Sequence, residues 1–166
     1  DVLLLAAWAE EREICLIVDE SLVDFTDETD SSLLEQAVLT QYPHLFVMKS
    51  ISKSYGVPGI RQGILAGDSK EMIAKLKKDV SIWNINSFAE YYMQIFGKYQ
   101  KCYREACYQF IKERERFQKE MDKVSFVRVI PSQANFFMID LTGRYTSNEL
   151  SSVLLKRFNI LIKSCN

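Results

Sequence analysis

The segment LFVMKSISKSYGVPGIRQGILAG, residues 45–67, decides how the first half of the chain is interpreted. It opens on a short apolar run, Leu45–Met48, which is typical of a strand covered on both faces. A lysine among serines follows, then a turn rich in glycine and proline, and an arginine eight residues after the lysine. A second apolar run, Gly63–Gly67, predicts the next strand. The segment therefore predicts two strands joined by a polar loop and a compact turn.

The residues around this segment alternate between predicted strands and helices. Upstream, the apolar run Ile14–Val18 predicts a strand that ends at Asp19, and an amphipathic helix over Val2–Arg12 precedes it. Ser31 or Ser32 is the predicted N-cap of a helix that runs to Gln41. Downstream, the pattern predicts a helix over Ser69–Lys78. This order is typical of an α/β fold with a mostly parallel sheet.

From about residue 87 the pattern changes. One long helical segment is predicted over 87–121, with Gly97 as the candidate for a bend, and shorter elements follow it. These are strands at 126–130 and 135–139, a helix at 147–157 and a strand at 160–163. We therefore predict part of a large domain at 1–86 and a small α+β domain at 87–166. The first has fewer strands than a complete sheet of about 5–6, so we expect a fragment of a longer protein.

Composition narrows the class of protein. The chain has 166 residues, 48% of them hydrophobic, and a net charge of −1, which favours neither nucleic acid nor an anionic membrane as a partner. Its longest apolar opening run, Val2–Ala9, is far short of the roughly 20 residues of a membrane span. Four cysteines without a C-x-x-C pair and one histidine predict no metal site. We interpret the cysteines as reduced thiols of a cytoplasmic protein.

The polar residues at the predicted strand ends suggest a binding site. Ligands of open α/β sheets bind at the carboxyl ends of the strands. Asp19 ends one strand, and the next is followed by Ser50, Ser52 and Lys53. The glycine-rich turn can return Arg61 toward the lysine, and its guanidinium suits a phosphate. The pattern predicts a phosphate site beside a reactive amine, with a carboxylate at a distance.

Three motifs in this order resemble the class I/II pyridoxal-phosphate enzymes, the aspartate-aminotransferase superfamily. Ser50-Ile51-Ser52-Lys53, followed by Gly59-Ile60-Arg61, resembles the family pattern [ST]-x-S-K…G-x-R. Asp19-Glu20 stands where the family has D-E-A-[YF], and PSQANF at 131–136 resembles S-x-A-N-F. Within the superfamily the resemblance points to the histidinol-phosphate aminotransferase branch, which also contains threonine-phosphate decarboxylase-like members.

The resemblance implies roles for individual residues. Pyridoxal 5′-phosphate (PLP) would be the cofactor, bound covalently by Lys53, which would also transfer the substrate proton. Asp19 would keep the pyridine nitrogen protonated, and Ser50, Ser52 and Arg61 would hold the 5′-phosphate. Lys49, outside the motif, is the rival lysine. Weaker candidates are Asn135 for the substrate, and Asn84 and Asn86 where the chain crosses between the domains.

The implied activity is amino-group transfer between an amino acid and a 2-oxo acid, in amino-acid biosynthesis, by a homodimer when full length. Leu22 departs from this expectation, because it stands where the family has a tyrosine that donates to the cofactor. Phenylalanine occurs there in the decarboxylase-like members. Decarboxylation of a phosphorylated amino acid is therefore one alternative, and a non-catalytic fragment that keeps the fold is another. The N-P-x-x-P-[TS]-G loop of the family has no match, so we expect residues 1–166 alone to be inactive.

Overall fold

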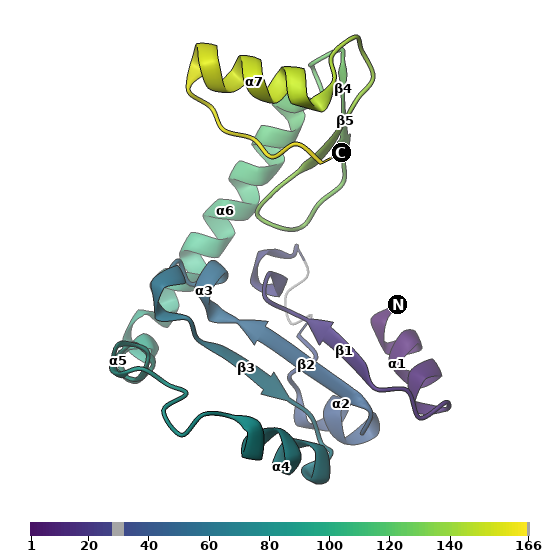
Figure 1. Ribbon diagram of the computed structural model, residues 1–166, viewed down its shortest axis with the longest axis vertical. Coiled ribbons are helices and arrows are strands. Elements are labelled where there is room, and N and C mark those ends of the chain that lie inside the picture. Colours follow the sequence, from purple (N-terminus) through teal and green to yellow (C-terminus); the bar gives the residue numbers. More distant parts are fainter. Residues whose placement is uncertain (28–31, 166) are drawn as a thin grey trace. The chain divides into compact units, whose positions relative to one another are not determined.

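The computed structural model describes residues 1–27 and 32–165, and Figure 1 shows its elements. They form two compact units, Asp1–Gln109 and Phe110–Asn166. The elements that precede the longest helix, α6, are α1 (Val2–Glu10), β1 (Leu16–Asp19), η1 (Val23–Phe25), α2 (Gln36–Gln41), β2 (Leu45–Ser50), α3 (Ile51–Ser54), η2 (Pro58–Ile60), β3 (Gly63–Ala66), α4 (Lys70–Asp79), α5 (Ser87–Phe96) and η3 (Gly97–Tyr99). The remaining elements are α6 (Gln100–Met121), β4 (Val127–Ile130), β5 (Met138–Leu141) and α7 (Ser147–Phe158).

The first unit is built on a three-stranded sheet in the order β1-β2-β3. β1 and β2 are parallel, with Asp19 opposite Met48, whereas β3 runs antiparallel to β2, with Gly63 opposite Ser50. The fold is therefore α/β, as predicted, with a mixed sheet. The parallel pair places the carboxyl ends of β1 and β2 at the same edge, where the polar loop begins (Figure 1).

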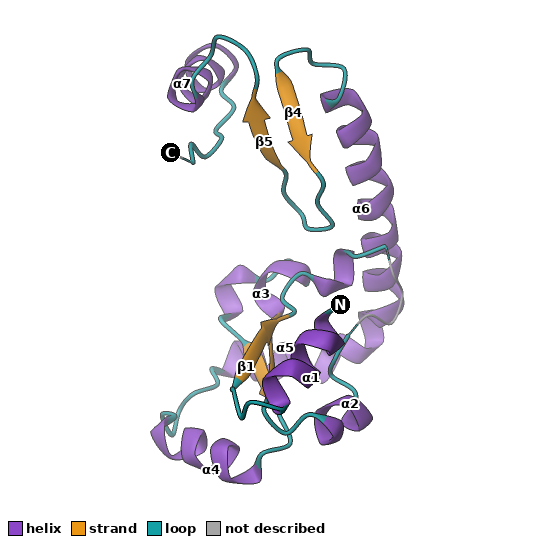
Figure 2. Cartoon of the chain, turned by 90° about the vertical axis from the view of Figure 1, so that its right-hand side faces the viewer, coloured by secondary structure: helices purple, strands orange, loops and turns teal. Residues whose placement is uncertain are grey.

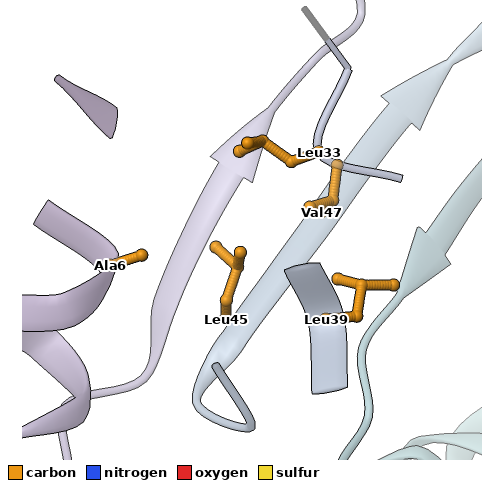
Figure 3. Packing of buried hydrophobic residues seen from close by; sticks show 5 residues of the cluster. All are labelled: Ala6, Leu33, Leu39, Leu45 and Val47. Atoms are coloured by element: carbon orange, nitrogen blue, oxygen red, sulfur yellow. The ribbon is translucent and has the colours of Figure 1, made fainter. Parts of the chain in front are cut away.

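The core of this unit lies against the middle strand. Leu45 and Val47 of β2 are almost fully buried, and Ala6 from α1 and Leu39 from α2 pack with them (Figure 3). Leu33, in the segment before α2, completes the cluster. The apolar run Leu45–Met48 thus lies in β2, the most buried of the three strands, because side chains of the helices pack against it.

The start of the second helix was predicted wrongly. α2 begins at Gln36, not next to the predicted caps; Ser32 lies before it, and Ser31 lies outside the described residues. The Ser32 hydroxyl donates to the Glu20 carboxylate at 2.7 Å, and the same carboxylate accepts from the Leu33 N–H at 2.5 Å. The buried Glu20 carboxylate thus accepts the hydrogen bonds that could have capped a helix here, and the segment before α2 stays irregular.

The bend predicted at Gly97 is confirmed. α5 ends at Phe96, a short 3-10 turn (η3) starts at Gly97, and α6 continues from Gln100. Residues 87–109 belong to the first compact unit, so the structure is divided within α6. This division by compactness differs from the predicted boundary at 86/87, which stays a prediction about the domains of the intact protein.

The second unit contains the β4–β5 hairpin, whose strands are antiparallel, and α7 (Figure 2). β5 starts at Met138 rather than at the predicted Asn135. The Ser132 hydroxyl explains the difference, because it donates to the Phe136 carbonyl at 2.8 Å and accepts from the Ala134 N–H at 3.1 Å. These bonds form a turn where the sequence indicated a strand.

The last predicted strand, 160–163, is also wrong. The segment after α7 is irregular, and no strand in the described part of the chain pairs with it. It is held to α7 instead, since the Ser151 hydroxyl donates to the Ile162 carbonyl at 3.2 Å and the Ser147 and Ser164 hydroxyls lie 2.9 Å apart. An apolar segment without a neighbouring strand cannot form a ladder.

None of the helices in residues 1–27 and 32–165 is long and apolar enough to cross a membrane.

Candidate functional site

Asp19 is the last residue of β1, and its carboxylate is held by its own chain. Oδ1 accepts from the Ser21 N–H at 2.8 Å and from the Ser21 hydroxyl at 2.5 Å. These two bonds hold the pKa of the Asp19 carboxyl below its ordinary value of 3.8, against the effect of partial burial, and the Lys53 charge acts in the same direction. Asp19 is therefore a carboxylate near neutral pH, and the Lys53 amine lies close enough for its charge to act on it.

Lys53 lies on α3, the single turn of helix that follows β2. The Ser50 hydroxyl caps this turn by accepting from the Ser52 N–H at 3.4 Å. Ser52 is buried and Lys53 is exposed. Within the described residues, the Lys53 amine makes no hydrogen bond or ion pair. It is thus available to a ligand that reaches the ends of the strands.

Lys49, the rival lysine, has a different environment. Its side chain is 10% exposed, and its amine donates to Asp24 Oδ1 at 2.6 Å. The other oxygen of Asp24 accepts from the Tyr103 hydroxyl at 2.7 Å. Burial and this bond raise the pKa of the Tyr103 phenol. Because its amine is already paired inside the protein, Lys49 is a poor candidate for covalent chemistry.

The turn that follows α3 brings Arg61 back toward it. The Ile51 N–H donates to the Gln62 carbonyl at 3.2 Å, so the neighbour of Arg61 is bonded to the first residue of α3. Gly56 has φ +66°, and Arg61 itself has φ 56°, a left-handed conformation that is uncommon outside glycine. The guanidinium is exposed and forms no bond within the described residues.

Asn86 is the better supported of the two crossover candidates. Its side-chain amide donates to the Ile60 carbonyl at 2.8 Å, directly before Arg61. Its side-chain oxygen accepts from the Ala89 N–H at 2.9 Å and caps α5. Asn86 therefore fixes the turn that carries Arg61 to the start of α5. The structure gives Asn84 no comparable contact among the described residues.

Sequence reasoning missed part of the support for α3. Tyr55, directly after this turn of helix, stacks on Phe96 with ring centroids 4.5 Å apart and meets Tyr103 edge-on at the same distance. Tyr103 in turn reaches Asp24 and so the Lys49 pair. The helical spacing of the tyrosines in 87–121 does not indicate which polar group each hydroxyl reaches.

Asn135 lies in the turn before β5, in the second compact unit, and is exposed. Its substrate contact stays a prediction. The described residues contain no group of three or more histidine, cysteine, aspartate or glutamate side chains that could hold a metal ion.

The sequence and the fold were compared with known proteins. The whole chain, residues 1–166, matches the family described as Aminotransferase class I and II. It is 35% identical to the L-serine phosphate decarboxylase of Sulfurospirillum multivorans over 90% of this chain and 39% of that protein. It is 33% identical to the CMP-5′-(3-aminopropyl)phosphonate synthase of Streptomyces rubellomurinus, over 93% of this chain and 24% of that protein.

The solved structures agree with these matches. The histidinol-phosphate aminotransferase of Clostridium acetobutylicum superposes with a TM-score of 0.86 at 33% identity, over 97% of this chain and 47% of that one. The chain thus spans 24% to 47% of the length of these relatives. The histidinol-phosphate aminotransferase branch indicated by the motifs is among the matches, together with a decarboxylase of a phosphorylated amino acid.

Proposed function

Because this chain belongs to the class I and II aminotransferase family, whose cofactor is PLP, we propose that it supplies the cofactor-binding residues of a PLP-dependent enzyme. The observation that supports this most directly is the placement of Asp19 and Lys53. A carboxylate and an unpaired amine lie at the carboxyl ends of two parallel neighbouring strands, where α/β sheets bind their ligands.

The chemistry of these groups fits the cofactor. The ionised Asp19 supplies a negative charge for a protonated pyridine nitrogen, and Lys53 supplies a primary amine for covalent attachment. Ser50, Ser52 and Arg61 offer hydroxyl and guanidinium donors for a phosphate, and the turn joins them to one strand end. When bound, the cofactor supplies an electron sink for a substrate carbanion.

The residues of this chain have separate tasks in the proposed enzyme. Asp19 orients the ring through its nitrogen, and Arg61 with the serines anchors the phosphate end. Lys53 moves a proton to or from the substrate carbon. Asn86 keeps Arg61 in place through the Ile60 carbonyl, at 2.8 Å.

For the reaction, we propose decarboxylation of a phosphorylated amino acid. Leu22 offers no hydroxyl at the position where the family's aminotransferases have tyrosine, and the decarboxylase of Sulfurospirillum multivorans is 35% identical. This reverses the order expected from the motifs, which placed transamination first. Amino-group transfer is the second candidate, supported by the likeness to the histidinol-phosphate aminotransferase structure at TM-score 0.86. The homodimer and the cytoplasmic location stay predictions.

The first test concerns the lysine. Full-length protein mixed with PLP should show the absorbance band of lysine-bound cofactor, and Lys53→Ala should abolish it because the amine of the rival Lys49 is paired with Asp24. Lys70→Ala, at an exposed position at the start of α4, is the matched control and should keep the band. An unchanged band in Lys53→Ala would refute the assignment.

The second test separates the two reactions. Full-length protein is given L-serine phosphate, with and without a 2-oxo acid acceptor. Decarboxylation predicts release of CO2, equimolar with the amine formed, in the absence of any acceptor. If amino-acid consumption needs the 2-oxo acid and no CO2 appears, the protein is an aminotransferase toward this substrate.

A further inference from the structure

Ser21 connects the two halves of the proposed cofactor site through one buried hydroxyl. This side chain follows Asp19 by two residues and is 9% exposed. Its hydroxyl donates to Asp19 Oδ1 and accepts from the Ser50 N–H at 2.9 Å. Asp19 ends β1, whereas Ser50 ends β2 and caps the turn of helix that carries Lys53.

The geometry explains why a hydroxyl is useful at this point. The ladder between β1 and β2 continues as far as the bond from the Glu20 N–H to the Met48 carbonyl, at 2.7 Å. β1 then turns away, and the Glu20 carbonyl accepts instead from Val23, at 3.1 Å. The Ser21 hydroxyl takes over as acceptor for the Ser50 N–H, which would otherwise lack a partner at the edge of the core.

The same hydroxyl limits the rotation of the Asp19 carboxylate. Two donors from Ser21, its N–H at 2.8 Å and its hydroxyl, converge on a single oxygen, Oδ1. The second oxygen, Oδ2, is left for another partner. The family pattern D-E-A-[YF] has alanine at this position, and alanine can supply only the N–H. The added hydroxyl therefore fixes the carboxylate and sets its distance from β2.

We infer that Ser21 is a positioning residue for the cofactor: it orients the Asp19 carboxylate toward the ring nitrogen and holds it in register with the strand end that carries Lys53. This inference rests on the proposed function. It assigns Ser21 no contact with substrate or cofactor, because its effect passes through Asp19.

The test measures cofactor affinity in the full-length protein freed of PLP. Ser21→Ala should raise the Kd for PLP about 10- to 100-fold, the usual effect of losing a hydrogen bond to a charged group. The second probe is the PLP analogue in which a C–H replaces the ring nitrogen. Its Kd should change less than about 2-fold on the same substitution, because it offers Asp19 nothing to bind.

Two further variants distinguish positioning from support of the fold. Ser21→Thr keeps the hydroxyl and should restore PLP affinity to within about 3-fold of the wild type. In an Asp19→Asn background, Ser21→Ala should have little additional effect, since residues that act through one another are not additive. If Ser21→Ala does not fold, Ser21→Cys, which keeps a weaker donor, takes its place with the same criterion of selectivity.

The outcomes are separable. Equal loss of affinity for PLP and the analogue would overturn the inference, because it would show that Ser21 only supports the fold. No loss for either would overturn it as well. If the wild-type protein itself does not bind PLP, the proposed function fails, and this result is distinct from both.

Discussion

Each of the two compact units of the chain is stabilised internally by a different kind of interaction. In the part of the chain that the structure describes, every buried apolar side chain belongs to residues 1–109. Residues 110–165 contain one buried side chain, and it is charged: Arg114, which is 5% exposed. The first unit therefore depends on the removal of apolar surface from water, whereas the second depends on local polar and aromatic contacts.

The contacts within the second unit are specific, but they do not enclose a buried apolar core. The Arg114 guanidinium donates to the Gln133 carbonyl at 2.5 Å and so joins α6 to the turn before β5. Thr146 and Glu149 form a reciprocal cap at the start of α7. Phe117 faces Phe137 with ring centroids 5.7 Å apart. Contacts of this kind are local, and none of them substitutes for a core.

This contrast between the units accounts for the position of the candidate site. A site must hold its groups within fractions of an ångström, and this requires rigid neighbours. Ser50 ends β2, in which Leu45 and Val47 are almost fully buried, and Lys53 follows on α3. Asp19 ends the neighbouring strand β1, which pairs with β2 along its whole length. Asn135, the weakest site prediction, lies in a turn of the unit without an apolar core.

The largest effect is expected from Leu45→Ala. Leu45 is 1% exposed in the middle of the core, so the substitution should lower the free energy of unfolding by about 2–5 kcal/mol. The matched variant is Leu150→Ala on α7, where the side chain is half-buried and should cost less than half as much. Urea unfolding of the full-length protein measures both. Equal costs would contradict the contrast between the units.

A smaller effect is expected from Arg114→Met, which keeps the length of the side chain but removes the donor to Gln133. Loss of a hydrogen bond from a charged group should cost about 1.5–3 kcal/mol. Arg116→Met, two residues along the same helix, removes an exposed pair with Glu113 and should change stability much less, because solvent screens that pair.

Hydrogen exchange read separately for the two units locates the loss. Amides of residues 110–165 should lose protection in Arg114→Met, and those around β2 should not. A loss spread evenly over both units would show that Arg114 supports more than the hairpin region.

The sequence predicted the strands of the first unit well, because continuous apolar runs are typical of strands. Burial on both faces followed only in part, since Ile17 of β1 is 61% exposed and Ile64 of β3 is 44% exposed. Leu45–Met48 was assigned to a strand, and the strand extends over Leu45–Ser50. Gly97 was identified as a bend because glycine weakens a helix locally. The errors occur where side-chain hydrogen bonds replace regular structure. Ser32 bonds to Glu20 instead of capping a helix, and the bond from Ser132 to the Phe136 carbonyl extends a turn into the start of the strand predicted at 135–139.

In the candidate site, too, the sequence did not predict the side-chain hydrogen bonds. The motifs predicted Lys53 and Arg61 on one loop, with Asp19 at the end of a neighbouring strand, and backbone bonds join Glu20 to Met48 and Ile51 to Gln62. Spacing gave no indication that Ser21 links β1 to β2, because that contact spans 29 residues and depends on the strand register. The role of Lys49 in a buried pair with Asp24 was hidden for the same reason.

The smallest expected effect concerns how stability depends on pH through one carboxylate in each unit, Asp19 in the first and Glu149 in the second. The Ser21 hydroxyl and N–H hold the pKa of Asp19 below 3.8, and the Thr146 N–H and hydroxyl hold the pKa of the fully exposed Glu149 below 4.5. A lowered pKa adds stability above the group's ordinary value, and that stability is lost as the pH falls through the folded value. Ser21→Ala and Thr146→Ala should therefore each raise the pKa of their carboxyl, and the stability each variant loses at pH 7 should shrink below about pH 4.

Carbon-detected NMR titration of the two carboxyls measures these pKa values directly. The upward shift should be larger for Asp19 than for Glu149, because Ser21 is buried beside the sheet and solvent screens the exposed cap of α7. A carboxyl that titrates at the same pH with and without its hydroxyl partner would show that the partner does not hold it in solution. For Asp19 that result would remove the physical basis on which Ser21 was assigned its positioning role.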